Sequence, residues 1–397
     1  MRVAGIVAEY DPFHKGHEAH IAATRASGGA THVVAVMSGS FTQRGEPAAL
    51  SKFDRACMAL SCGADLVLEL PLPWAMASAE RFAAGGVGVL TSLGCVEMLS
   101  FGSECGDVSL LERLAALPER EDYRRLLKET MDTGVSYAVA RQQAVEMLLG
   151  KEAAAPLASP NNTLGMEYIR AARLQGADFD FYTLQRQGTL HHDGAPQEGF
   201  ASATLLREWL RQGDVERSTA YMPAAAGEIL HEAVAAGRGP ADPSRLEGAL
   251  LARLRSMTAA DFAALPYVSE GLENRLWQAA QTASTVEEWL TMVKTRRYPM
   301  ARLRRILWAA LLGLPQESDF LQVPYIRVLG MNRRGREILS VARPTLPLLT
   351  RSSQVEAMDD AAKAVFALEC RATDLHALTL PTPPSCGGDY TKKLLRL

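Results

Sequence analysis

The first hundred residues alternate between short apolar runs and longer stretches with helical composition. The apolar runs lie at 3–10, 31–39, 64–71 and 96–104. Nearly uninterrupted apolar runs of this length are typical of strands buried on both faces of a parallel sheet. The stretches between them, at 14–28, 51–63 and 77–94, carry helix formers, with Ser51 placed as an N-cap. The alternation predicts an α/β domain built on a doubly wound parallel sheet.

The pattern changes after residue 108. Residues 108–158 are alanine-rich and helical in character, 159–174 open from a loop into a helix, and 179–188 form a further strand candidate. From about 217 the chain is mainly helical, and 224–243 is the best linker candidate. The pattern therefore predicts two regions, a sheet domain over 1–215 and a mainly α-helical region over 216–397.

Composition narrows the class without naming a ligand. The 397 residues are 48% hydrophobic and carry a formal net charge of −3, which is typical of an ordinary globular protein. Any polyanion binding must therefore come from a local patch. No run approaches the ~18 uncharged apolar residues of a membrane span, and the six cysteines form no CxxC pair. We expect a cytoplasmic protein with reduced thiols and no membrane association.

The chemistry concentrates in HKGH, residues 14–17, between the first strand and the first helix. Ligands of open parallel sheets bind where strands end and helices begin, and a helix N-terminus offers unpaired N–H groups that suit a phosphate. Gly16 removes a side chain where a nucleotide could approach. His14 and His17, spaced i and i+3, could donate hydrogen bonds to phosphate oxygens. The alternative is that they pack against or cap the turn, which four residues alone do not exclude.

HKGH in this position resembles the HxGH signature of the nucleotidyltransferase superfamily. Further stretches, in order from residue 3 to about 340, resemble the bacterial tRNA(Met) cytidine acetate ligase family. They are SGSFTQRGEPAALSKFDRA (38–56), GADLVLELP (63–71), FGSE (101–104), SPNNTLGMEYIRA (159–171), GFASATLLR (199–207) and YIRVLGMNRRGREIL (325–339). The final 55 residues resemble the family less clearly.

The resemblance implies a nucleotidyltransferase-like, ATP-binding catalytic domain over 1–215 and a tRNA-binding region over 216–397. It implies that ATP and acetate form acetyl-adenylate, and that the acetyl group passes to N4 of the wobble cytidine of elongator tRNA(Met). AMP and pyrophosphate leave. ATP is the expected cosubstrate, Mg²⁺ is a candidate companion ion, and no metal site of the protein itself is predicted.

The resemblance also implies site residues. His14 and His17 are the expected catalytic pair. The expected ATP-binding residues are Ile6, Val7, Ala8, Glu9, Tyr10, Asp11, Pro12, Phe13, His14, Lys15, Gly16, His17, Glu18, Ala19, His20, Gly102, Asn162 and Arg186. From residue chemistry alone, Gly102 could be an ordinary strand-end glycine, Asn162 a turn former and Arg186 a surface arginine.

Two departures from the family pattern stand out. HHDGAP (191–196) has a histidine where a tyrosine is expected, and Asp11 stands where asparagine is frequent. The carboxylate of Asp11 could repel a nucleotide or cap the following helix.

Basic residues are dense in two segments. KTRRYPMARLRR (294–305) holds six Lys or Arg in twelve residues, and 327–337 adds four arginines. Such density suits an RNA phosphate backbone, although a single charged run is more often a solvated helix face. The expected tRNA contacts are Arg44, Lys294, Arg296, Arg297, Arg304 and Arg333.

Two alternative functions remain. HKGH suits an adenylyltransferase acting on a small-molecule phosphate substrate equally well, but the basic segments would then have no role. A tRNA-binding protein with a vestigial nucleotide site is the second alternative. AMP and modified RNA as products would separate the expected ligase from the first, and ATP binding would separate it from the second.

Overall fold

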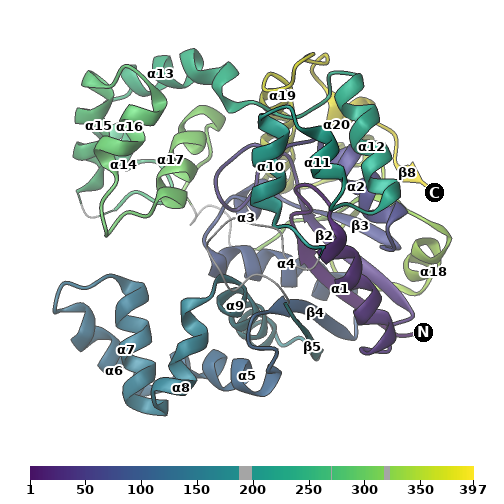
Figure 1. Ribbon diagram of the computed structural model, residues 1–397, viewed down its shortest axis with the longest axis horizontal. Helices are drawn as coiled ribbons and strands as arrows, with labels where there is room; N and C mark the ends of the chain where they lie inside the picture. Colours follow the sequence, from purple (N-terminus) through teal and green to yellow (C-terminus); the bar gives the residue numbers. More distant parts are fainter. Residues whose placement is uncertain (187–198, 270, 317–321) are drawn as a thin grey trace.

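The computed structural model describes residues 1–186, 199–269, 271–316 and 322–397 (Figure 1). The HHDGAP departure at 191–196 lies outside the described residues.

A single sheet organises the chain. Its order is β5 (Asp180–Gln185), β4 (Met98–Ser103), β1 (Val3–Ala8), β2 (His32–Ser38), β3 (Leu66–Leu70), β6 (Ile326–Met331) and β7 (Leu348–Leu349), with β8 (Leu395–Arg396) paired to β6. Strands β1 to β4 are parallel, as predicted, and each overlaps one of the apolar runs, while β5 overlaps the strand candidate 179–188 and is parallel to β4. β6 is antiparallel to β3, while β7 and β8 are parallel to β6. The mostly parallel sheet with its helices confirms the predicted fold class.

The helices of the first half are α1 (Lys15–Ala26), α2 (Lys52–Ser61), α3 (Leu72–Ala75), α4 (Ala79–Leu93), α5 (Val108–Ala116), α6 (Glu121–Met131), α7 (Tyr137–Leu149), α8 (Lys151–Ala154) and α9 (Pro160–Leu174). Those of the second half are α10 (Ala203–Arg211), α11 (Val215–Thr219), α12 (Ala224–Ala235), α13 (Glu247–Arg255), α14 (Ala259–Ala263), α15 (Leu272–Thr282), α16 (Val286–Val293), α17 (Met300–Leu312), α18 (Arg333–Val341), α19 (Asp360–Ala377) and α20 (Gly388–Thr391). Ser51 caps α2 by accepting from Asp54 N, as predicted.

Strands β1 to β4 are almost entirely buried on both faces, which explains their continuous apolar sequences. In β2, Val34 and Val36 point into the core shared with α4 and α9, whereas Val33 and Met37 point into the core shared with α2 and α12. Side chains alternate between faces along a strand, so each face supplies its own apolar set. The helices on the two faces bury both sets.

The predicted linker at 224–243 is wrong. Residues 224–235 form α12, which packs against α2. Ala226, Leu230 and Ala233 are buried at helical spacing and belong to the core on that face of the sheet. The abundance of alanine and glycine concealed an ordinary amphipathic helix.

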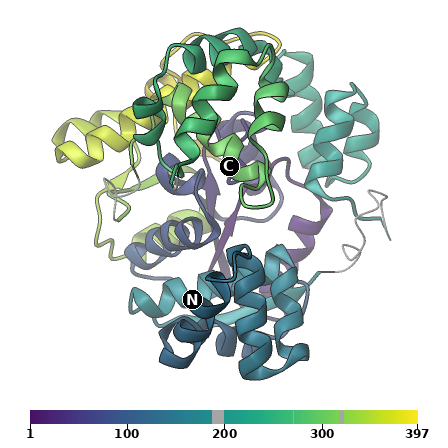
Figure 2. The ribbon, with the colours of Figure 1, turned by 90° about the vertical axis from the view of Figure 1, so that its left-hand side faces the viewer.

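The C-terminal half leaves the sheet and then returns to it. Helices α13 to α17 pack around an apolar core that includes Trp289 and Leu303, and this core continues to Phe41 after β2 and to Leu368 in α19. Figures 1 and 2 show these helices on the same side of the molecule as α6 to α8. Strands β6 to β8 and helix α19 then rejoin the sheet region, which the sequence did not predict. The division at residue 215 stays a prediction.

Candidate active site

The HKGH segment lies where the sequence placed it, between β1 and α1. β1 ends at Ala8 and α1 begins at Lys15, with His14 as the N-cap. Because β1, β2 and β4 are parallel, this loop lies at the carboxyl edge of the sheet. The fold therefore favours ligand binding around the N-terminus of α1.

The two histidines cap the helix reciprocally. His14 Nδ1 accepts from Gly16 N at 3.1 Å, and His17 Nδ1 accepts from His14 N at 3.2 Å. Their rings stack with centroids 3.7 Å apart. A neutral imidazole that accepts through Nδ1 carries its proton on Nε2, so the cap assigns both tautomers. Capping and phosphate binding are thus compatible, because the cap leaves two Nε2–H donors.

These Nε2–H groups stay neutral donors near pH 7. Burial, with a contribution from Arg186, lowers the pKa of His14 to about 3. Burial and the neighbouring His14 hold the pKa of His17 well below its usual range. Among the described residues, neither Nε2 has a hydrogen-bond partner in the protein. Two adjacent neutral donors suit an anion that the protein does not itself provide.

Gly16 is required by the histidine cap. A Cβ at this position would lie 2.9 Å from His14 Cε1, closer than side-chain carbons approach one another. The sequence assigned Gly16 to nucleotide approach, and the structure adds this local reason.

His20, one turn further along α1, is held from the sheet. Its Nε2 lies 2.9 Å from Ser100 Oγ, which in turn lies 2.7 Å from Thr24 Oγ1. Burial lowers the pKa of His20 to about 4. These hydrogen bonds link the inner face of α1 to the middle of β4.

The two carboxylates of the loop are already engaged by the protein. Glu9 Oε1 accepts from Gln43 N at 2.7 Å, and burial raises the pKa of Glu9. Asp11 Oδ1 accepts from Ala49 N at 2.7 Å, and its Oδ2 lies 3.5 Å from Arg207 Nη1. The suggestion that Asp11 caps the following helix is wrong, since His14 is the cap. Arg207 offsets the charge through which Asp11 would repel a nucleotide.

Arg207 is the functional candidate that sequence reasoning missed. It lies on α10, is 8% exposed, and donates from Nη1 to Asp11 O at 2.6 Å. Its neighbours Leu206 and Trp209 are core residues. An arginine within an apolar helix face, in the stretch 199–207 that carries the family resemblance, was the available signal.

Gly102 and Arg186 come together at the ends of β4 and β5. Arg186 N donates to Ser103 O at 2.9 Å. A Cβ on Gly102 would lie 3.4 Å from Arg186 Cγ, so the arginine side chain passes over the glycine. Burial lowers the pKa of Arg186, and its Nε has no partner in the described structure. The positive charge of this guanidinium contributes to the lowered pKa of His14, His17 and His20.

Asn162 holds a loop together instead of making a turn of its own. It lies in the first turn of α9, where its Oδ1 accepts from Glu104 N at 2.9 Å and Cys105 N at 3.0 Å. Its Nδ2 donates to Pro156 O at 3.0 Å. The side chain therefore positions the loop after β4, and a direct contact with ATP stays a prediction.

Other members of the expected cradle serve packing. Lys15 Nζ donates to Ala220 O at 2.8 Å, which anchors the start of α1 to the end of α11. Ile6, Tyr10 and Phe13 are at most 2% exposed, so any contact they make with a ligand would come from the backbone. Val7, Ala8, Pro12, Glu18 and Ala19 complete the segment, with Glu18 exposed.

The loop after β2 joins the site to the first predicted basic segment. Exposed Arg44 donates to Thr204 Oγ1 at 2.9 Å, near the start of α10. Arg304 Nη1 lies 2.6 Å from Glu46 Oε1, and a Cβ on Gly45 would lie 2.4 Å from Arg305 N. Lys294, Arg296 and Arg297 are exposed on the connection before α17. The structure therefore brings Arg44 and the segment 294–305 to neighbouring positions.

Arg333 lies elsewhere. Asn332 N donates to Asp65 O, just before β3, and Glu337 Oε2 lies 3.1 Å from His32 Nε2 at the start of β2. Arg333 therefore lies at the amino edge of the parallel strands, opposite His14. Arg327 of the same basic segment is not a surface residue, because it pairs with Glu69 at 2.8 Å.

In the described ranges, no three His, Cys, Asp or Glu side chains converge as a metal-binding group. All six cysteines are free thiols. Of the helices that the structure describes, none is both long and apolar enough to cross a membrane.

Comparison with known proteins agrees with this geometry. The HIGH Nucleotidyl Transferase family model matches residues 1–387. The tRNA(Met) cytidine acetate ligase of Acetivibrio thermocellus is 38% identical over 416 residues, covering 100% of both chains. That of Syntrophotalea carbinolica is 40% identical over 403 residues, covering 96% of this chain and 95% of the relative.

Solved structures agree as well. The crystal structure of Thermotoga maritima TmcAL bound with alpha-thio ATP superimposes with a TM-score of 0.93 at 32% identity, and it covers 100% of both chains. The apo form of TmcAL gives a TM-score of 0.95 at 33% identity with the same coverage. The chain therefore belongs to the tRNA(Met) cytidine acetate ligase family of HIGH nucleotidyl transferases.

Proposed function

We propose that this enzyme activates free acetate with ATP and transfers the acetyl group to N4 of the wobble cytidine of elongator tRNA(Met). Family membership supports an ATP-dependent tRNA-modifying ligase. The observation that carries the proposal is the pair of neutral histidines, capped through Nδ1 and left with two Nε2–H donors at a helix N-terminus. We also propose a cytoplasmic location, which a tRNA substrate supports.

In the first step, an acetate oxygen attacks the α-phosphorus of ATP and pyrophosphate leaves. Negative charge grows on the oxygens around phosphorus and on the leaving group, so the catalyst must align the reactants and stabilise charge. His14 and His17 would donate Nε2–H bonds to these oxygens without giving up a proton. The half-buried guanidinium of Arg186 would add positive charge.

In the second step, the N4 amine of the cytidine attacks the acetyl carbon of acetyl-adenylate. AMP is the leaving group, and the amine loses a proton as the amide forms. The adenylate is an intermediate, so the enzyme consumes ATP to AMP and pyrophosphate while the RNA gains an acetyl group.

Mg²⁺ would accompany the ATP phosphates. The carboxylates nearest the histidines already accept from backbone amides, Glu9 from Gln43 N and Asp11 from Ala49 N. Each of these carboxylates already has a protein partner, and we propose that the ion is held mainly by phosphate and water oxygens, as Mg²⁺ commonly is.

The tRNA would approach over the loop after β2. Arg44, Lys294, Arg296, Arg297 and Arg304 lie on this loop or on the α16–α17 segment packed against it. We infer that they supply backbone contacts next to the active site. An adenylyltransferase for a small molecule would have no use for exposed cations such as Lys294 and Arg296.

The test is incubation with ATP, labelled acetate and total bacterial tRNA. We expect label in one tRNA species, as N4-acetylcytidine, together with one AMP for each acetyl group. The variant His17→Ala serves as the matched control and should incorporate almost no label. An adenylylated small molecule in place of labelled RNA would contradict the proposal.

A further inference from the structure

The C-terminal tail crosses the edge of the sheet and carries a row of cations. β8 pairs with β6 through Gly330 with Leu395 and Met331 with Arg396, and Leu397 N donates to Met331 O. Lys392 and Lys393 immediately precede this strand and are exposed, as is Arg396. The tail therefore lies along β6 with its basic side chains directed to solvent.

Helix α18 extends this row. It begins directly after β6, so its first residue, Arg333, lies near Arg396 in the paired strand. Arg334 and Arg336 are also exposed. The edge strip is defined here as Arg333, Arg334, Arg336, Lys392, Lys393 and Arg396.

The cations of the edge strip are poorly neutralised. Within the described residues, the one carboxylate in ion-pair distance of any of them is Glu337, 3.6 Å from Arg333 and itself about half exposed. Residues 326–397 contain eleven Lys or Arg against seven Asp or Glu, although the whole chain has a net charge of −3. The strip is thus a local positive region on a slightly negative protein.

The basic side chains of the segment 294–305 make more contacts with the rest of the protein. Arg304 pairs with Glu46 at 2.6 Å, Arg302 Nε donates to Tyr267 O at 2.8 Å, and Arg305 Nη1 donates to Gln43 O at 3.0 Å. Half of its six basic side chains therefore hold the protein together. In density of sequence charge the two regions look alike, but more of the side chains in the segment 294–305 are held by hydrogen bonds to the protein.

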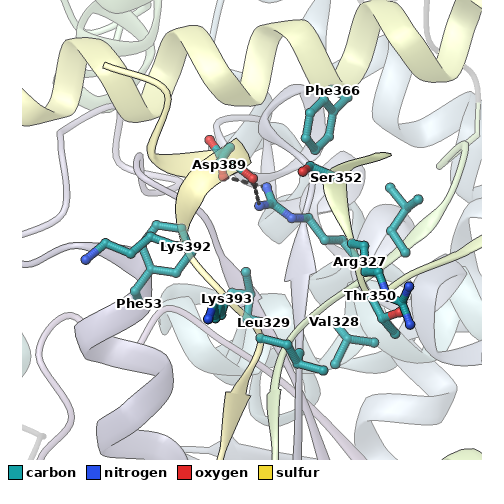
Figure 3. A pocket seen from close by; sticks show the side chains of 13 residues that line it. Phe53, Arg327, Val328, Leu329, Thr350, Ser352, Phe366, Asp389, Lys392 and Lys393 are labelled. Atoms are coloured by element: carbon teal, nitrogen blue, oxygen red, sulfur yellow. Dashed lines mark hydrogen bonds and ion pairs between the residues drawn. The ribbon is translucent and has the colours of Figure 1, made fainter. Parts of the chain in front are cut away.

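A shallow recess adjoins the lysine end of the strip. Figure 3 shows Lys392 and Lys393 beside Phe53 and Leu329, with Arg327 turned toward Asp389. Arg327 Nη1 is 2.6 Å from Asp389 Oδ1 and 2.8 Å from Glu69 Oε2, so its charge is already matched. Lys392, Lys393 and Arg351, which also lines the recess and is exposed, are therefore the cations that this recess can offer to an anion.

The strip connects the two edges of the sheet. Arg327 faces Glu69 near the end of β3, so the recess lies toward the carboxyl edge, where the active site is. β6 and β8 then run to the amino edge, where α18 begins. An anion that follows the strip must be extended, as a nucleic-acid backbone is.

We propose that the edge strip binds the phosphate backbone of the RNA substrate, as a second contact surface distinct from the segment 294–305. This inference rests on the proposed function. Exposed lysines and arginines on flexible stems suit backbone phosphates and carry no information about base sequence. In Figure 1, α18 and β8 lie on the opposite side of the molecule from α17, so one RNA would be held at two separated places.

The test is the double variant Lys392→Glu and Lys393→Glu, with Lys128→Glu and Lys151→Glu as the matched control. All four lysines are exposed, and both pairs change the net charge equally. The tail variant should weaken tRNA binding about tenfold or more. The slope of log affinity against log salt should become shallower by about 2, near 0.9 for each lost phosphate contact. The control should keep wild-type affinity.

Acetate-dependent release of pyrophosphate without tRNA, together with thermal unfolding, should match the wild type in both variants. Equal loss of tRNA affinity in both pairs would mean a general charge effect and would overturn the proposal, as would unchanged binding by the tail variant. The milder pair Lys392→Ala and Lys393→Ala should shift affinity in the same direction. If wild-type protein binds tRNA through the strip but never transfers acetate, the proposed function fails while the strip stands.

Discussion

The HKGH loop and the basic segment 294–305 are both predicted to hold phosphate, yet they are built in opposite ways. The histidines are uncharged, packed against each other at 3.7 Å, and oriented by backbone hydrogen bonds. The basic side chains before α17 are charged, and Lys294, Arg296 and Arg297 are exposed. Fixed neutral donors stabilise charge at one place during a reaction, whereas mobile cations attract a polyanion in a salt-dependent way. Changes in the loop should therefore alter chemistry, and changes in the segment should alter RNA affinity.

The largest effect is expected from His17→Ala, which removes one fixed donor. Acetyl-adenylate formation should fall by a factor on the order of 10² or more. The assay is acetate-dependent pyrophosphate release without tRNA. His17→Asn separates the two roles of the residue, since its amide oxygen can still accept from His14 N but cannot replace Nε2–H. Wild-type rates in His17→Ala would remove the residue from the mechanism, and recovery by asparagine would mean that only the cap matters.

The role of the basic segment 294–305 is tested by the double variant Arg296→Glu with Arg297→Glu. tRNA affinity should fall by about tenfold or more and its salt dependence should flatten, because fewer counterions are released on binding. ATP affinity should stay near wild type, since these residues lie outside the HKGH loop. The measurement is tRNA binding over a salt series with ATP binding in parallel. Unchanged affinity and slope would assign the segment to a solvated surface.

The size of the carboxylic acid that the enzyme accepts tests how closed the region around the HKGH loop is. Residues such as Tyr10 and Phe13 beneath the loop are at most 2% exposed, so a propionate methylene should find little room. We expect acetate to be preferred about tenfold, near the lower end of the roughly 10–200-fold that one methylene can give. Competing rates of adenylate formation measure this preference. Equal use of butyrate would show an open acid site.

The smallest expected effect is on pH dependence. The folded pKa values of His14 and His20, about 3 and about 4, lie below the ordinary value of 6.5. At pH values between the folded pKa values and 6.5, the unfolded chain binds more protons than the folded protein. The stabilisation that each neutral histidine contributes is therefore fully present above pH 6.5 and is lost as the pH falls toward the folded pKa values. Each histidine should contribute about 1.4 kcal/mol of unfolding free energy per pH unit in this window.

Denaturant unfolding from pH 7 to pH 5 measures this loss. His20→Gln can keep the hydrogen bond to Ser100 and removes one titrating group, so its curve should be shallower on the acid side. The rate of adenylate formation should show no histidine step between pH 6 and 8. An activity step near pH 6.5 would mean that a histidine of the loop titrates normally.

Local sequence predicted the elements that depend on neighbouring residues. The five parallel strands, Ser51 as a cap and the position of HKGH between β1 and α1 all follow from short-range patterns. The residues that complete the site come from far away in the chain. Arg207 reaches Asp11 across 196 residues, and no periodicity within either segment reports that contact.

Sequence by itself determined the α/β class, the family resemblance and the loop in which the chemistry would lie, because strand burial, capping and glycine placement are local. Tertiary structure alone decided that β6 to β8 close the sheet from the C-terminal half. It also placed Arg333 at the amino edge and left the tail lysines exposed while Arg304 and Arg327 pair with carboxylates. Two basic runs of similar composition differ in this way because the availability of a charge depends on its partners in space. Those partners are brought together only when the chain folds.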